Sequence, residues 1–272
     1  MAESFYRLGK SLAIMISVVI PTYKEPDHLD LCIKSCITGA HHPTEIIVVV
    51  DGFYSLNKSV LDKYPSVKIL NFEQNRGLSV ATNVGVYNAS RDFVLIVNDD
   101  NVFPKNWDVK LLEDLAPRMV LTPNQIEPSP SIFNQFVIKN LGLDPATFDL
   151  NRFWDIASDI SIDKVDCSGS TLPFSMRKRD FLAVGGWEEL YPSPHVVDWD
   201  FFLKCEYFSF SMLRTYKSHF YHFASAATRS TPEQNRISSE KEMRGKHFYA
   251  QKWGFAPYHN FEDNSKIPPN FR

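Results

Sequence analysis

The sequence predicts an α/β fold, in which helices flank a mainly parallel sheet, and three observations support this prediction. Short runs rich in Val, Ile and Leu alternate with amphipathic stretches over residues 1–125, which is typical of βα units. The runs contain few polar residues, as expected of strands that helices cover on both faces. The chain has 272 residues, 44% of them hydrophobic, which is enough to bury a substantial core.

Each apolar run predicts one strand of the sheet. Five strands are predicted in this way, at residues 16–20, 45–50, 67–70, 93–97 and 119–121. Between the first two, apolar residues recur from Leu29 to Ile37 at the spacing of one helix face, and Gly39 ends that helix. Residues 77–90 and 107–116 supply two further crossover helices.

The second half of the chain is less regular. Residues 123–163 are dominated by Pro, Asn, Asp and aromatic residues, over a length that is typical of a functional segment or a lid. An apolar stretch at 171–176, a helix at 177–184 stopped by two glycines, and a helix beginning near residue 198 follow. The motif Thr231-Pro232-Glu233-Gln234 is a capping box with proline at the first helical position, so a last helix opens there and ends near Gly254.

Composition excludes several classes of protein. The 29 basic and 32 acidic residues give a net charge of −3, so no general attraction to nucleic acid or anionic lipid is expected. The four cysteines form no CxxC pair and are predicted to be reduced, buried thiols. The apolar run at 12–20 is about half of a membrane span, and no cleavage site follows it. We therefore expect a cytoplasmic protein, with peripheral attachment to a membrane left open.

Polar residues follow three of the predicted strands, at the sheet edge where open α/β sheets bind their ligands. Pro21, Thr22 and Tyr23 follow the first strand, Asp51 follows the second, and residues 98–101 follow the fourth with the sequence Asn-Asp-Asp-Asn. Adjacent carboxylates suit Mg²⁺ or Mn²⁺ bridged to phosphates, although a polar turn has the same composition. Because the chain has no glycine-rich phosphate loop, a bound nucleotide would need a metal to neutralise its diphosphate.

Four blocks of sequence together resemble the family 2 glycosyltransferases of GT-A fold, namely ISVVIPTY at 16–23, EIIVVVDG at 45–52, NRG at 75–77 with Asn83 and Gly85, and NDD at 98–100. The resemblance covers residues 16–225 and resumes most clearly at 185–187 and 198–204. It implies a GT-A-type, Rossmann-like sheet with an acceptor-side insert and a C-terminal helix. It also implies inverting transfer of a sugar from a nucleoside diphosphate donor, UDP-linked in most members, to a hydroxyl of a glycan, glycolipid or other acceptor.

The resemblance also implies a division of the chain. Residues 1–230 would form the glycosyltransferase domain, with a nucleotide-binding half at about 14–125 and an acceptor half at about 126–230. Residues 231–272 would form a C-terminal helix and tail packed on that domain.

By resemblance, one group of residues would bind the donor nucleotide and a second would hold a Mn²⁺ or Mg²⁺ cofactor. The donor group, in which Asp51 meets the base and Asp99 the ribose, comprises Pro21, Thr22, Tyr23, Asp51, Arg76, Asn83 and Asp99. The metal would be held by Asp100 and by His222, with His219 as the alternative histidine. Three positions depart from the family, since Asn98 replaces its usual Asp, Phe53 its usual Ser, and Val197 the acid that often precedes the general base.

The catalytic candidate is Asp198, because the family's general base stands before a helix and six residues ahead of a basic residue, here Lys204. Its alternative role is to cap that helix. Asp200 competes for the catalytic role and, with Trp187, is assigned to sugar or acceptor contact. For Trp187 core packing is the alternative.

Two other functions fit part of the pattern. A sugar nucleotidyltransferase also uses an α/β sheet and paired acids, but would normally carry a glycine-rich, basic loop where this chain has Pro21-Thr22-Tyr23-Lys24. A non-catalytic protein that binds nucleotide sugars would keep the pocket and lack turnover.

Overall fold

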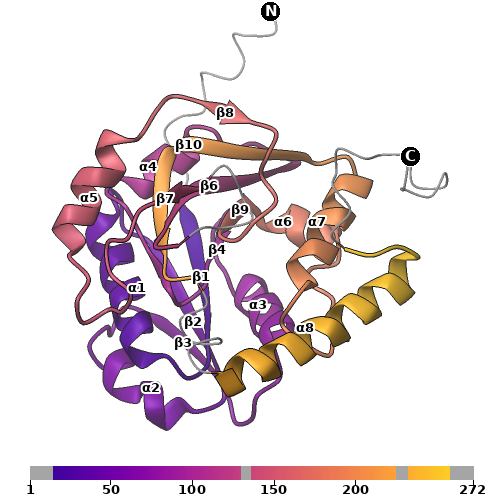
Figure 1. The fold of residues 1–272 in the computed structure, drawn as a ribbon. Coiled ribbons are helices and arrows are strands. Elements are labelled where there is room, and N and C mark those ends of the chain that lie inside the picture. The colour runs from indigo at the N-terminus through magenta and orange to yellow at the C-terminus, as the bar shows by residue number, and fades with distance from the viewer. Residues whose placement is uncertain (1–14, 130–135, 225–231, 258–272) are drawn as a thin grey trace, which may run out of the picture.

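A single mixed sheet forms the centre of the molecule, with helices on both faces (Figure 1). The computed structural model describes residues 15–129, 136–224 and 232–257. Within them the sheet has ten strands, in the order β3-β2-β1-β4-β9-β6-β10-β5, with β7 paired to β6 and β8 to β10. The sheet is parallel from β3 to β4, and β9 then runs antiparallel to both of its neighbours, β4 and β6.

The five predicted strands are confirmed. They are β1 (Ile16–Thr22), β2 (Glu45–Asp51), β3 (Lys68–Phe72), β4 (Phe93–Ile96) and β6 (Met119–Glu127). Helices cover β1, β2 and β4 on both faces, but not β3, several of whose side chains are exposed. The expectation of full burial was therefore wrong for β3, because it is the edge strand of the sheet.

Helices α1 (Pro26–Gly39), α2 (Tyr54–Leu61) and α4 (Trp107–Leu112) pack on one face, and α3 (Leu78–Tyr87) on the other. The predicted helices are confirmed, and α2 was not predicted. The α1 stripe is buried except for Ile37, which is 42% exposed. On the opposite face Gly85 lets α3 lie directly on the sheet, since a Cβ there would stand 2.3 Å from a Val19 methyl.

The second half of the sheet is completed by β9 (Phe174–Arg177) and β10 (Ser211–His222), and by three two-residue strands, β5 (Asn101–Val102), β7 (Val137–Ile138) and β8 (Val165–Asp166). The described part of residues 123–163 contains more regular structure than expected, namely the end of β6, then β7, and then helix α5 (Leu150–Asp159). The polar residues of β6 are buried, and Gln125 Nε2, for example, donates to the Leu172 carbonyl at 2.6 Å. A hydropathy pattern cannot reveal the polar second half of such a strand.

Three further helices close the structure, namely α6 (Lys178–Ala183), α7 (Val197–Tyr207) and α8 (Pro232–Trp253). All three were predicted, although the capping residue Thr231 lies outside the described residues. Figure 1 shows α8 running across the lower edge of the molecule, past α3 and α7. No helix in the described part of the chain is long and apolar enough to cross a bilayer.

The cysteines are free, and three of them are buried as expected, Cys32, Cys36 and Cys205. Cys167 is exposed, so the prediction of buried thiols was wrong at this position. It lies in the connection between β8 and β9, outside the helices and strands that bury the other three.

Candidate active site

A hydrogen bond between Thr22 and Asp99 joins the carboxyl ends of β1 and β4. Thr22 Oγ1 donates to Asp99 Oδ2 at 2.7 Å, and the Thr22 side chain is buried. Burial raises the pKa of Asp99 to about 7, with a further contribution from the neighbouring Asp100 carboxylate. Pro21 pairs with Val49 inside the sheet, so it forms part of the strand.

Asp100 meets His222 because β10 pairs with β5 in a register that sets His222 opposite Asn101. His222 Nε2 lies 3.5 Å from Asp100 Oδ2, and His222 Nδ1 lies 2.8 Å from Glu127 Oε1 at the end of β6. Burial lowers the pKa of His222, but the carboxylates of Asp100 and Glu127 outweigh it and leave the pKa above its usual value. His222 is therefore oriented by one carboxylate and turns its other nitrogen toward a second.

This arrangement fits a metal-binding pair. Metal-ligating histidines commonly bond a carboxylate through the ring nitrogen that does not touch the metal, as His222 bonds Glu127. Asp100 Oδ1 is buried and has no hydrogen-bond partner in the described structure, which leaves an oxygen free for a cation. No group of three or more His, Cys, Asp or Glu in the described residues could hold a metal ion by itself. The other ligands would therefore have to be water and substrate oxygens.

The alternative histidine, His219, is held in the interior. It is 2% exposed, and its ring lies beside Tyr216, with ring centroids 6.5 Å apart. Burial and the nearby Lys110 lower its pKa to about 4. Of the two histidines, His222 is the one that contacts Asp100.

Asp51 holds the loop that leads into α3. Its carboxylate accepts the backbone N–H of Arg76 at 2.6 Å and of Gly77 at 2.9 Å, and the Asn75 side-chain amide at 3.0 Å. Burial raises the pKa of Asp51 despite these bonds. The Arg76 guanidinium lies 5.2 Å from the centre of the Phe72 ring. The sequence had suggested contact with the base for Asp51 and had not shown this loop-binding role.

Two exposed aromatic residues flank the same edge of the sheet. Tyr23, which is 39% exposed, and Phe53, which is 47% exposed, meet edge to face with centroids 5.1 Å apart. Lys24 Nζ lies 4.2 Å from the Phe53 centroid. Phe53, the departure from the family pattern, thus lies beside Tyr23, a residue predicted to line the nucleotide pocket.

Asn83 and Trp187 are hydrogen-bonded to each other and do not face the carboxyl edge of the sheet where a ligand would bind. Asn83 Oδ1 accepts the backbone N–H of Trp187 at 2.8 Å, and Asn83 Nδ2 donates to the Trp187 carbonyl at 2.8 Å and to Glu189 at 2.9 Å. Trp187 is 2% exposed and belongs to the core on the α3 face. It offers no free ring face for stacking on a sugar, so core packing, the alternative interpretation, is what the structure contains.

Asp198 lies in the first turn of α7, and the residue at the N-cap is Val196. The capping alternative was therefore wrong in position. Burial raises the pKa of Asp198 to about 6, although hydrogen bonds from backbone amides of the first turn oppose the rise. A carboxylate with this pKa can accept a proton near neutral pH.

The contacts of α7 direct its first turn, which contains Asp198, toward the carboxyl edge of the sheet. The helix ends beside the amino end of β6, where the Arg118 side chain donates to the Phe208 carbonyl. Its 11 residues span about 16 Å, so its first turn points toward the carboxyl edge. Phe201 packs on Phe174 at 5.4 Å between centroids, and Phe174 pairs with Ile96, two residues before Asn98.

Asp200 is not available for acceptor contact. It is fully buried and lies next to α8, where its carboxylate accepts hydrogen bonds from Trp253 Nε1 at 2.7 Å and from Lys252 Nζ at 3.1 Å. The predicted role for Asp200 is corrected accordingly, because its oxygens are used inside the fold. No signal in the sequence paired it with residues more than 50 positions away.

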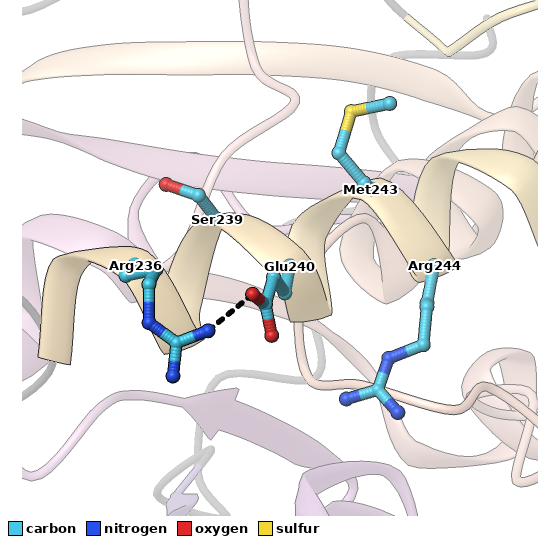
Figure 2. Close-up of a pocket in the computed structure, with 5 residues that line it drawn as sticks. All are labelled: Arg236, Ser239, Glu240, Met243 and Arg244. Carbon is cyan, nitrogen blue, oxygen red and sulfur yellow. Dashed lines mark hydrogen bonds and ion pairs between the residues drawn. The ribbon is translucent and has the colours of Figure 1, made fainter. Parts of the chain in front are cut away.

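A hollow on the outer face of α8 is lined by Arg236, Ser239, Glu240, Met243 and Arg244. Figure 2 shows Arg236 turned toward Glu240 on the same helix, and these two side chains form an ion pair. The hollow is thus a gap between side chains of one helix, and its residues include none of the candidates described above.

Comparison with known proteins gives matches to glycosyltransferases. Residues 17–133 match the model of the family described as "Glycosyl transferase family 2". Glycosyltransferase GlyA of Streptococcus pneumoniae is 35% identical over 95 residues, which cover 34% of this chain and 14% of GlyA. The glucosyl-dolichyl phosphate glucuronosyltransferase of Haloferax volcanii is 24% identical over 185 residues, 64% of this chain and 56% of that protein. The chain thus spans only part of the length of these relatives.

Solved structures confirm the GT-A-like fold. TarS of S. aureus, residues 1–349, aligns with a TM-score of 0.54 at 15% identity, covering 93% of this chain and 76% of that one. GalNAc-T7, solved with UDP, GalNAc and Mn²⁺, aligns with a TM-score of 0.57 at 14% identity, covering 77% and 44%. The chain is therefore similar to glycosyl transferase family 2 over residues 17–133, and its fold is GT-A-like.

Proposed function

We propose that this protein is an inverting, metal-dependent glycosyltransferase that moves a sugar from a nucleoside diphosphate donor, most simply a UDP-sugar, to a hydroxyl group. The acceptor would be a glycan, a glycolipid or another hydroxyl compound. The observation that carries the proposal is the Asp100–His222–Glu127 cluster at the edge of the sheet toward which α7 directs Asp198. The donor class is supported by the UDP complexes of TarS and GalNAc-T7.

In this proposal Asp100 and His222 hold Mn²⁺ or Mg²⁺, with Glu127 orienting the histidine. When bound, such a cation neutralises charge on a diphosphate leaving group. The Mn²⁺ in the GalNAc-T7 structure supports a cation of this kind. The Thr22–Asp99 pair lies next to this cluster, on the side where Tyr23 and Phe53 would border the nucleotide.

Asp51 and Arg76 would shape the pocket from the second strand, since Asp51 binds the backbone of the loop that carries Arg76. Asn83 and Trp187 would support the pocket from the core through their hydrogen bonds to each other, with no direct contact to the donor. The nucleotide-binding half then spans about residues 14–125 and the acceptor half about 126–230, with α8 packed against the latter.

Asp198 would take the proton from the acceptor hydroxyl as that oxygen attacks the anomeric carbon. In the same step the bond between the anomeric carbon and the diphosphate oxygen of the donor breaks, and the nucleoside diphosphate leaves. This single displacement inverts the configuration at the anomeric carbon. The raised pKa of Asp198 supports this role, because a base with a pKa near 6 is ionised at neutral pH and still accepts a proton in the transition state.

The products distinguish this function from its alternatives. The protein is incubated with UDP-sugars and Mn²⁺, and free UDP and pyrophosphate are measured. Release of UDP that stops on addition of EDTA is expected, because transferases pass some sugar to water. Pyrophosphate formed from UTP and a sugar phosphate would instead support a nucleotidyltransferase, and binding without any product would support a binding protein.

The Asp100→Ala variant should lose UDP release and Mn²⁺-dependent donor binding. Asp163→Ala is the matched control, because it removes a carboxylate that is 90% exposed in its side chain and distant in sequence from the cluster. Full UDP release by Asp100→Ala, or by the wild type in excess chelator, would contradict the metal assignment.

A further inference from the structure

Helix α8 contacts the segment that carries Asp198 at three points along one helix face. Ser238 Oγ lies 3.1 Å from His195 Nε2, within hydrogen-bond distance. A Cβ on Gly245 would stand 2.6 Å from the His195 carbonyl oxygen, so only glycine allows this approach. Lys252 forms the third contact, with Asp200. Because residues 238, 245 and 252 are seven apart, close to two helical turns, they share one face.

The contact at Asp200 is the strongest of the three. Trp253 Nε1 donates to Asp200 Oδ1 at 2.7 Å, and Lys252 Nζ lies 2.8 Å from the same oxygen. The Tyr191 hydroxyl also donates, at 3.3 Å, and Lys204 Nζ lies 3.8 Å from Asp200 Oδ2. A fully buried carboxylate costs several kcal/mol unless it is paired and hydrogen-bonded. Residues of α8 supply the two shortest of the contacts that stabilise Asp200.

The start of α7 needs an external support of this kind. Its N-cap residue, Val196, has φ +74°, a left-handed conformation that a β-branched residue rarely adopts. Such a conformation persists only where the surroundings impose it. Helix α8 packs against this residue, since a Cβ on Gly245 would lie 3.2 Å from a Val196 methyl. Asp198 lies two residues after Val196 and two residues before Asp200, so α8 contacts the chain on both sides of Asp198.

We infer that α8 positions Asp198, and that Lys252 and Trp253 are positioning residues that act on it through the buried carboxylate of Asp200. The catalytic part of this inference rests on the proposed function, in which Asp198 is the general base. Loss of the Asp200 anchor would let the first turn of α7 relax. The reaction geometry would suffer, whereas the donor site at the ends of β1, β2 and β4 would keep its own contacts.

The test uses Trp253→Phe, which removes the indole N–H and keeps an aromatic ring. The expected result is a fall in kcat of about tenfold, with the donor KM changed less than about twofold, because displacements near 1 Å can cost up to about a hundredfold. Met243→Gln is the matched control on the same helix, since Met243 is 63% exposed on the outer face (Figure 2). Lys252→Met should act like Trp253→Phe, and Lys252→Arg should recover most of the activity.

An unchanged kcat in both Trp253→Phe and Lys252→Met would overturn the inference. Loss of kcat and donor affinity together, in proportion to unfolded protein, would also overturn it, because α8 would then only stabilise the fold. Hydrogen exchange decides the positioning separately from the reaction. Faster exchange over residues 193–200 in Trp253→Phe, but not in Met243→Gln, is expected, and unchanged exchange contradicts the inference. A wild type without transfer would instead contradict the proposed function.

Discussion

Asp198 shows how burial sets the behaviour of a single side chain. Its pKa of about 6 lies above that of an exposed Asp, so the fold favours the protonated form. The carboxylate therefore weakens the folded state progressively as the pH rises through roughly 4 to 6, the window between the unfolded and folded pKa values. For a general base the same shift means that transfer declines as the pH falls below about 6.

We predict that Asp198→Asn lowers the turnover number by about 10²- to 10⁴-fold and keeps donor affinity, because Asn cannot take the proton from the acceptor hydroxyl. At pH 7.5 its melting temperature should equal or exceed that of the wild type, since the penalised charge is absent. Transfer assays and thermal unfolding at pH 5 and pH 7.5 measure both effects. Retention of more than about a tenth of turnover, well short of that loss, would remove Asp198 from the catalytic role.

Asp51 leads to a prediction about both stability and binding. The base-recognition hypothesis predicts that Asp51→Ala weakens uridine nucleotide binding and leaves the fold intact. The structure adds a cost of about 1–3 kcal/mol in unfolding free energy, because the N–H groups of Arg76 and Gly77 lose their acceptor. Urea denaturation and calorimetry with UDP measure the two terms. Unchanged stability would contradict the loop-binding role, and unchanged UDP affinity would contradict the role at the base.

Residue types at strand ends could be read from the sequence, but their partners could not. Thr22, Asp99 and Asp100 follow apolar runs, so their shared edge was predictable. Glu127 was not predicted because it ends a strand whose second half is polar. The buried position of Asp200 was not predicted because its partners lie in a helix 52 and 53 residues away. Such contacts depend on tertiary packing, which local sequence patterns do not predict.

At the scale of elements, α3 offers a direct test of packing. A methyl group at Gly85 would stand 2.3 Å from Val19 Cγ1 and 3.1 Å from Val49 Cγ2. We predict that Gly85→Ala lowers the unfolding free energy by about 1–3 kcal/mol, despite the better helix propensity of Ala, because a filled core resists added volume. Chemical denaturation provides the measurement.

The double variant Gly85→Ala with Val19→Ala tests the cause of that loss. If the clash with Val19 is responsible, the second substitution removes it and the two effects fall short of their sum. Additive losses would show that the strain arises elsewhere.

The elements of the first half were predictable and those of the second were less so, for a physical reason. Strands β1, β2 and β4 are apolar because both of their faces are covered. Strand β10 contains Arg214, Thr215, Ser218 and His219, all buried, so its sequence resembles a surface segment. Arg214 donates hydrogen bonds to neutral oxygens of Ser168, Thr171 and Pro123. Each of these partners is distant in the chain, and no periodicity indicates them.

For the whole molecule, ligand binding should appear as added stability. A ligand at 100 times its dissociation constant adds about 2.7 kcal/mol, which corresponds to a rise of about 5–10 °C in Tm for a chain of this size. We predict such a rise for UDP with Mn²⁺, a smaller one for UDP alone, and none for Mn²⁺ alone, because the described residues lack a complete metal site. Thermal unfolding with GDP as the comparison nucleotide measures this. Equal shifts with and without Mn²⁺ would contradict a metal-bridged diphosphate.

The strand order also determines when the molecule can be completed during its synthesis. Strands β1 to β4 pair with one another in a parallel set formed by residues 16–96, so this pairing needs no later strand. Strand β5 and one edge of β6 pair with β10, so both stay unpaired until β10 has been made. Strand β10 ends at residue 222, more than a hundred residues after β5. A nascent chain shorter than this exposes an unpaired strand edge, the kind of surface that aggregates and that chaperones bind. Because β10 also brings His222 to Asp100, the proposed metal-binding pair can form only after this last strand is in place.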